Sequence, residues 1–184
     1  MSNLRLIDET SVTSAVNTIQ ITDVFSADFD VYCIEAVGIS SETSQDNNSA
    51  DIRLINSNGS IQSGSSIYDS EMIYARGFDQ NYLEIGGYNR DDFSLLYYDT
   101  SANNAFGNFT MWIFNPFNSD SYTFQVQQSI GTSRRPTNSI NSMWHKGIGV
   151  LRELSSITGF CLIQRDSNNV ATGTFRTYGL RVDS

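Results

Sequence analysis

Apolar and polar residues alternate with a period of two along most of this chain. In residues 122–127, Tyr122, Phe124 and Val126 point to one side and the polar residues to the other. This is the pattern of a half-buried antiparallel strand. Similar alternation, or a short apolar run bounded by Gly, Asn, Asp and Ser, predicts about eleven strands in all. Besides residues 122–128 they are residues 4–7, 18–24, 29–39, 51–55, 81–85, 93–98, 109–114, 146–151, 157–163 and 172–182.

No segment shows a long helical period, and only residues 68–77 contain enough helix formers ahead of a glycine for helix and strand to compete evenly. Residues 40–50, 56–66 and 131–142 are rich in Ser, Asn and Gly and predict exposed loops. The run 157–182 predicts one closed β-hairpin at the end of the chain, with its turn at residues 165–169.

These elements predict an all-β fold. An antiparallel chain must protect the edges of its sheets, and packing two sheets face to face with Greek-key connections does so. We therefore expect a two-sheet antiparallel β-sandwich of the jelly-roll type, formed by residues 1–184 as a single domain. The length of 184 residues and the 39% of hydrophobic residues supply a core of that size.

The charge distribution argues against two classes of partner. The formal net charge is −9, with 15 acidic and 4 basic side chains in residues 1–92 against 5 and 7 in residues 93–184. An acidic front half disfavours nucleic acid and anionic membrane as partners.

The first residues show no basic segment followed by an apolar one, and no run of about eighteen apolar residues occurs. We expect a protein made in the cytoplasm without a signal peptide.

The reactive side chains are few. Lys146 is the single lysine and His145 the single histidine, so a surface or structural role is expected for His145 rather than that of a catalytic base. Cys33 and Cys161 lie within apolar strands and are expected to be buried thiols, with a disulfide between adjacent strands as the alternative. No His or Cys spacing indicates a metal site. We expect no cofactor, although residues 41–48 and 166–169 carry oxygen ligands that calcium could use.

Acidic side chains are the remaining candidates for catalysis. Glycoside hydrolysis needs two facing carboxyl groups, and Asp28, Asp30, Glu35 and Glu84 are the residues to consider. Strict alternation places Glu35 on the face of Val31, Cys33 and Val37, so that face is partly wet or Glu35 has a partner such as an arginine. The others read as solvent-facing members of alternating strands, and no enzyme activity is expected.

Aromatic residues are the more promising binding groups, because flat rings contact sugar faces and protein partners alike. Trp112 lies in the apolar run 109–114 and is expected in the core. Trp144 follows a polar stretch and precedes His145 and Lys146, which predicts exposure at the boundary of a loop and a strand. Tyr97 and Tyr98, and also Phe106, lie beside the polar residues 99–104. We take Trp144, Tyr97 and Tyr98 as candidate ligand-binding residues for a sugar or a protein partner.

The segment 171–182, together with the strand 157–163, resembles the end of jelly-roll virion proteins from tailed bacteriophages. The agreement extends loosely to residues 111–116 and covers about a third of the chain. The resemblance implies a long final strand that closes the sandwich, no catalytic motif, and a component of the head, neck or tail that often forms a symmetric oligomer.

Two functions follow as expectations. The first is a non-enzymatic virion structural protein that docks on other capsid or tail proteins as a decoration or attachment component and forms a homo-oligomer in the virion. The alternative is a carbohydrate-binding, receptor-recognising module that uses its exposed aromatic residues.

Overall fold

The computed structural model describes residues 3–42, 48–77, 82–98, 106–134, 140–165 and 168–180. Every helix or strand assigned within these ranges is a β-strand. The twelve strands are β1 (Leu4–Val12), β2 (Thr18–Ile21), β3 (Val31–Ser41), β4 (Asn48–Asn56), β5 (Tyr68–Arg76), β6 (Tyr82–Arg90), β7 (Phe93–Tyr98), β8 (Gly107–Phe114), β9 (Thr123–Arg134), β10 (Ile140–Leu151), β11 (Ile157–Gln164) and β12 (Val170–Leu180).

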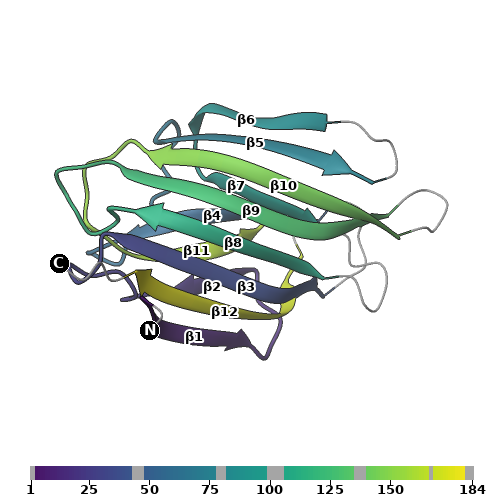
Figure 1. The fold of residues 1–184 in the computed structure, drawn as a ribbon, viewed down its shortest axis with the longest axis horizontal. Helices are drawn as coiled ribbons and strands as arrows, with labels where there is room; N and C mark the ends of the chain where they lie inside the picture. Colours follow the sequence, from purple (N-terminus) through teal and green to yellow (C-terminus); the bar gives the residue numbers. More distant parts are fainter. Residues whose placement is uncertain are drawn as a thin grey trace.

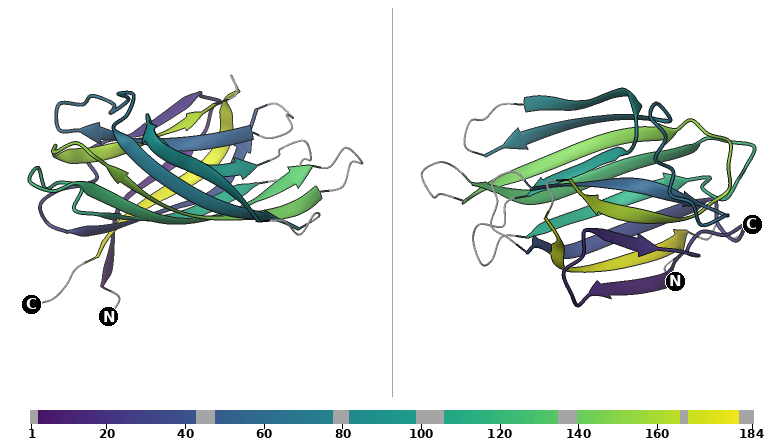
Figure 2. Two further views of the ribbon diagram at one scale, coloured as in Figure 1. Left: turned by 90° about the horizontal axis from the view of Figure 1, so that it is seen from above. Right: turned by 180° about the vertical axis from the view of Figure 1, so that it is seen from behind.

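The strands form two antiparallel sheets. Sheet A has eight strands in the order β1-β12-β3-β8-β9-β10-β5-β6, and sheet B has four in the order β2-β11-β4-β7. Sheet A is in front in Figure 1, and the view from above in Figure 2 shows sheet B stacked on one of its faces. The prediction of an all-β, two-sheet antiparallel sandwich is confirmed.

Strands from opposite ends of the chain are neighbours in both sheets. β1 pairs with β12, β2 with β11, β3 with β8 and β4 with β7. This nested order is that of a long hairpin rolled up so that successive strand pairs alternate between two sheets, which is the jelly-roll topology. Two further hairpins, β5–β6 and β9–β10, are inserted into it, and both join sheet A. The insertions widen sheet A to twice the width of sheet B.

The core lies between the sheets. Tyr32 and Ile34 of β3 and Phe160 of β11 are fully or almost fully buried. Phe25, in the segment before β3, packs edge-on against Tyr32 with ring centroids 4.8 Å apart and stacks on Phe160 at 6.1 Å. Each side chain of this size stabilises the fold by about 1.5–3 kcal/mol when fully buried. These aromatic contacts join the two layers at the end of the sandwich that β2 covers.

The last two strands do not form the hairpin that the sequence predicts for residues 157–182. β11 lies in sheet B between β2 and β4, whereas β12 lies in sheet A between β1 and β3. The connection between them crosses from one sheet to the other. Both strands are internal, which explains their strongly strand-like composition, but their partners come from distant parts of the sequence. The final strand does complete sheet A, as the resemblance implies.

Other boundaries differ from the expected ones. Residues 68–77, where helix and strand competed, form β5. The predicted loop 131–142 is shorter, because β9 continues to Arg134 and β10 begins at Ile140; residues 135–139 lie outside the described residues. The predicted loop 40–50 shortens in the same way, and residues 43–47 lie outside the described residues.

Strand β9 buries its polar side. The predicted alternation is present, but Gln125, Gln127 and Ser129 face the interior, at 1–5% exposure, while Phe124 and Val126 face solvent at 46% and 37%. The glutamines lie beside glycines of β10, since Gln125 pairs with Gly149 and Gln127 with Gly147. A Cβ atom at either glycine would lie 2.9 Å from the glutamine amide nitrogen.

Two of these inward side chains, Gln127 and Ser129, bond to the free edge of sheet B. β7 pairs only with β4, so its outer edge leaves backbone groups without strand partners. Side chains of sheet A satisfy several of them. Gln127 Nε2 donates to the carbonyl oxygen of Ser94, and Ser129 Oγ donates to that of Leu95 at 3.0 Å. The N–H of Ser94 donates to Ser70 Oγ of β5 at 3.2 Å. Buried polar groups on β9 and β5 thus replace a missing strand.

Val126→Thr is expected to change the free energy of unfolding by no more than about 0.5 kcal/mol, because the new hydroxyl faces solvent. The matched change Ile113→Thr places a hydroxyl at a fully buried position and is expected to cost about 2–4 kcal/mol. Urea unfolding of both variants measures the difference. Equal losses would contradict the orientation of β9.

Candidate binding surface on the large sheet

The register of sheet A aligns its outward side chains in straight rows across the strands. One row begins with Leu4 of β1 and runs through Leu180, Val31, Phe114 and Phe124 to Val150. The adjacent row begins with Leu6 and ends with Ile148; it contains Leu6, Tyr178, Cys33, Trp112, Val126 and Ile148. We call these two rows the apolar band.

The apolar band crosses six strands and carries no Asp, Glu, Lys or Arg. Leu6, Phe124 and Ile148 are 51%, 46% and 60% exposed. With a spacing of about 4.8 Å between strands, the band is about 24 Å long. It ends at β5, where Val150 faces Asp69 and Ile148 faces Glu71. A hollow of about 370 Å³ opens within it, lined by Phe114, Phe124 and Ile148 among others.

The row of outward side chains next to the apolar band is polar from β1 to β10, and we call it the polar row. Glu9, Arg176, Glu35, Thr110, Gln128 and Lys146 succeed one another in register from β1 to β10. Arg176 Nε donates to Glu9 at 2.6 Å. Glu35 is partly exposed, which agrees with the alternative that this face is partly wet. Its cross-strand neighbour is Arg176, whose guanidinium pairs with Glu9.

A groove of about 620 Å³ follows this polar row on the side away from the apolar band. Its lining comes from four neighbouring strands, β3, β8, β9 and β10. Its lining is more apolar than polar: Val37, Ile130 and Trp144 are 51%, 54% and 40% exposed, and polar side chains supply the rest. The lining includes Glu35, Asn108, Thr110, Gln128, Trp144 and Lys146.

The structure separates the three candidate ligand-binding residues. Trp144 is exposed, as expected, although it lies inside β10 rather than at a strand boundary. Tyr97 and Tyr98 belong to β7 of sheet B, which faces the inner side of sheet A, and their side chains lie outside the described residues. The three residues therefore do not form one site. The aromatic neighbour of Trp144 is Tyr82 of β6, whose ring lies edge-on at a centroid distance of 6.3 Å.

Trp112 is not in the core, contrary to the prediction. It lies in β8 on the outer face of sheet A, between Cys33 and Val126 in the apolar band, and is partly exposed. Its run of apolar neighbours is misleading because both faces of β8 are apolar: Phe109, Met111 and Ile113 face the core. Phe106, just before β8, is 41% exposed.

The acidic residues considered for glycoside hydrolysis do not face one another. Glu35 and Glu84 share the outer face of sheet A, but five strand spacings, about 24 Å, separate their strands. Paired glycosidase carboxyls lie about 5–9.5 Å apart. Asp28 and Asp30 are exposed in the segment before β3, where Asp28 accepts a hydrogen bond from Ser26 Oγ.

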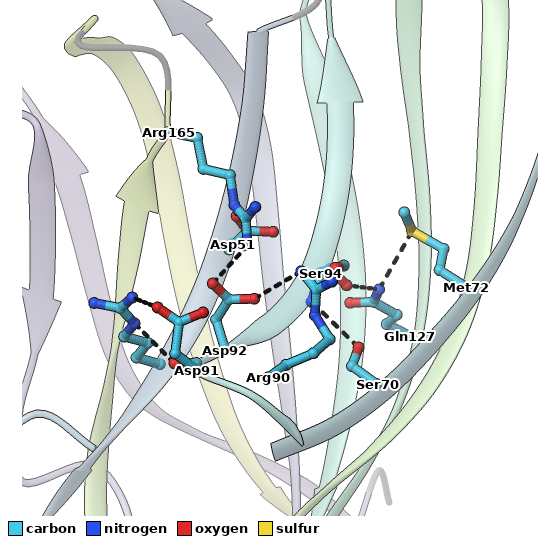
Figure 3. A network of polar contacts seen from close by, with 10 residues as sticks. Asp51, Ser70, Met72, Arg90, Asp91, Asp92, Ser94, Gln127 and Arg165 are labelled. Atoms are coloured by element: carbon cyan, nitrogen blue, oxygen red, sulfur yellow. Dashed lines mark hydrogen bonds and ion pairs between the residues drawn. The ribbon is translucent and has the colours of Figure 1, made fainter. Parts of the chain in front are cut away.

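A network of charged groups connects β4 and β11 with the turn before β7 (Figure 3). Arg165 pairs with Asp51 through Nε and with Asp92 through Nη2, the latter at 2.7 Å. Arg90 Nη2 reaches the other oxygen of Asp92 at 3.1 Å. The Asp51 and Asp92 side chains are only 7% and 5% exposed. Burial, together with the Asp92 charge, raises the pKa of Asp51 from 3.8 to about 7 despite the opposing charge of Arg165.

The histidine and the two thiols are buried. His145 is 1% exposed, and its Nδ1 lies 3.0 Å from Ser129 Oγ. Burial lowers its pKa to about 4, so the ring is neutral at pH 7 and serves as the structural residue that was expected. Cys33 and Cys161 lie in different sheets and are free thiols, as expected. Burial raises the pKa of each to about 11, which keeps both protonated and unreactive.

Within the described residues, no group of three or more His, Cys, Asp or Glu side chains could hold a metal ion. Most of the two calcium candidate loops lies outside those residues. The described part of the chain also contains no helix that is long and apolar enough to span a membrane.

The comparisons with known proteins show no family for this chain. No family model matches it, and no curated protein matches it. One solved structure, described as the structure of infectious bursal disease virus Gx strain, aligns with 12% identity and a TM-score of 0.16. The alignment covers 96% of this chain and 39% of that chain, so this chain spans about two fifths of its length. A likeness this weak carries no argument.

Proposed function

We propose that this protein is a non-enzymatic structural component of a tailed-bacteriophage virion, which docks on the capsid or tail surface through the apolar band. The observation that carries the proposal is the outward-facing apolar side of β9 within that band. A strand that buries glutamines and exposes Phe124 and Val126 leaves its apolar side chains free to contact a partner protein.

The size of the apolar band fits a protein interface. If large side chains expose about 150–250 Å² each when free, the observed exposures leave an apolar surface on the order of 500 Å². A standard interface buries about 800 Å² per partner, of which about 55–65% is apolar. The absence of Asp, Glu, Lys and Arg from the band matches the charge depletion of interface centres. The partner is therefore expected to present an apolar surface of similar size.

Ile148→Lys tests this proposal. It places a charge on the most exposed large side chain of the apolar band and is expected to weaken docking at least ~10-fold, because docking would bury that charge without a partner. The measurement is co-sedimentation of the purified protein with particles of the encoding phage assembled without it. Ile130→Lys is the matched control: Ile130 is 54% exposed on the same face but lies two rows away.

Wild-type protein and Ile130→Lys should pellet with the particles in a fixed ratio, and Ile148→Lys should remain in the supernatant. The proposal fails if wild-type protein does not bind particles, or if Ile148→Lys binds as well as the control. Sedimentation velocity of the isolated protein tests whether a second copy of the chain, rather than another virion protein, covers the apolar band. If the isolated protein self-associates, if Ile148→Lys abolishes that association and if no particle binding is seen, the apolar band is covered by a second copy of this chain and not by another virion protein.

A further inference from the structure

We infer that the groove beside Trp144 is a binding site for a short neutral oligosaccharide. It lies on the same face as the apolar band, and its lining includes four residues of the polar row but no residue of the band, so it can remain open when the band is covered. The inference does not depend on docking, and either can fail alone.

The polar side chains of the groove are available to a ligand. Within the described residues, Thr110, Gln128 and Lys146 make no hydrogen bond or ion pair through their side chains. Asn108 Oδ1 accepts a hydrogen bond from the N–H of Gly38 at 2.9 Å, which fixes the amide and leaves its NH₂ group as a donor. Groups of this kind on rigid strands are already in position and lose little freedom when a ligand binds.

The donors and acceptors suit hydroxyl groups. A sugar hydroxyl both donates and accepts, so a site for it needs both kinds of partner. In register, Glu35 supplies an acceptor, Thr110 and Gln128 supply both, and Lys146 supplies a donor. This row spans three strand spacings, about 14 Å, which is the length of a short oligosaccharide.

Trp144 provides the apolar platform that the C–H face of a sugar ring requires. Its indole also lines a second hollow of about 270 Å³ with Ala75 and Tyr82, so the ring stands between two open spaces. The edge-on contact with Tyr82 orients it. Ala75 is its cross-strand neighbour on β5 and lies in register between Trp144 and Tyr82.

The charge of the groove selects a neutral ligand. Glu35 and Lys146 are its two charged side chains among the described lining residues, and they cancel. The chain as a whole carries −9, which repels polyanions such as nucleic acids and strongly sulfated glycans. A single aromatic platform with four or five hydrogen-bonding groups predicts weak binding, with a Kd of about 0.1–1 mM.

The test uses the full chain, screened on an array of neutral and acidic oligosaccharides and then titrated with maltotriose, cellotriose, chitotriose and sialyllactose. The chain has two tryptophans, so Trp112→Phe leaves Trp144 as the single reporter without touching the groove. A neutral trisaccharide should shift the fluorescence of that variant. By calorimetry, Trp144→Ala and Gln128→Ala should each weaken binding at least ~10-fold, while Ile148→Lys in the apolar band should leave it unchanged.

Thermal unfolding of each variant tests whether a variant that loses binding is still folded. The inference is overturned if no array spot and no titrant at 10 mM gives a signal, or if Trp144→Ala binds as well as wild type. Preference for sialyllactose over every neutral probe would also overturn it.

Discussion

Arg165→Met is expected to lower the free energy of unfolding by about 2–3 kcal/mol at pH 8. The substitution removes the guanidinium that joins Asp51 and Asp92, and both carboxylates stay almost fully buried. Breaking a fully buried ion pair costs about 3–5 kcal/mol. We expect less here because 43% of the Arg165 side chain is exposed and solvent screens it. Asp92 also keeps its contact with Arg90.

The loss should be smaller at pH 5. The pKa of Asp51 is about 7 in the folded protein and 3.8 in the ordinary carboxyl, so the folded state binds a proton that the unfolded state releases between these values. The stabilisation from this proton is complete below about pH 4 and is lost as the pH rises through about 7. At pH 5 the Asp51 carboxyl is neutral and needs Arg165 less.

Urea unfolding at pH 5 and pH 8 measures both effects. Asp51→Asn should flatten the fall in stability between the two pH values. Arg176→Met is the control, since Arg176 pairs with Glu9 on the open face of the sheet and its loss should be undetectable at either pH. A loss for Arg165→Met that is equal at both pH values would show that Asp51 does not titrate in this range.

Gly159→Ala is expected to destabilise the protein by about 3 kcal/mol or more, because the strands of sheet B leave no room for a side chain there. A Cβ atom at Gly159 would lie 2.3 Å from the carbonyl oxygen of Ile21 and 3.0 Å from the Cα of Thr22. Both are backbone atoms, so β2 would have to move away from β11. The melting temperature and the hydrogen exchange of the β2 amides report this movement.

Gly59→Ala provides the comparison. Gly59 has a φ of +76° and nothing lies within 4 Å of an added Cβ atom. Only backbone strain of about 1 kcal/mol is expected there. If both alanine variants lose the same stability and β2 exchanges normally, close packing at Gly159 is not what requires glycine.

The sequence was sufficient to predict strands and a two-layer fold, because alternation with a period of two is a local property of the chain. It could not show which strands pair. The segment 157–182 read as a hairpin, yet β11 and β12 enter different sheets, since their partners lie far away in the sequence. The sequence also does not show which side of β9 faces the core. Gln127 and Ser129 face inward and donate hydrogen bonds to the edge of β7, and no residue near β9 in the sequence reveals that edge.

The candidate surface was predicted in part. Trp144 was identified as exposed from its polar neighbours, but Tyr97 and Tyr98 were assigned to the same site only because aromatic residues near polar loops share a pattern. The sequence did not reveal Ile130 and Tyr82 as neighbours of Trp144. They become recognisable only when the register of β9, β10, β5 and β6 is known.

The nested strand pairing also determines when this protein can fold. β12 occupies the place between β1 and β3, so the first strand finds its partner only when the last one has been made. Topologies dominated by such distant pairings fold slowly, on the scale of milliseconds to seconds. On the ribosome, the jelly roll must therefore remain incomplete until β12 has been synthesised and has emerged. Sheet A cannot form strand by strand in the order in which its strands are made.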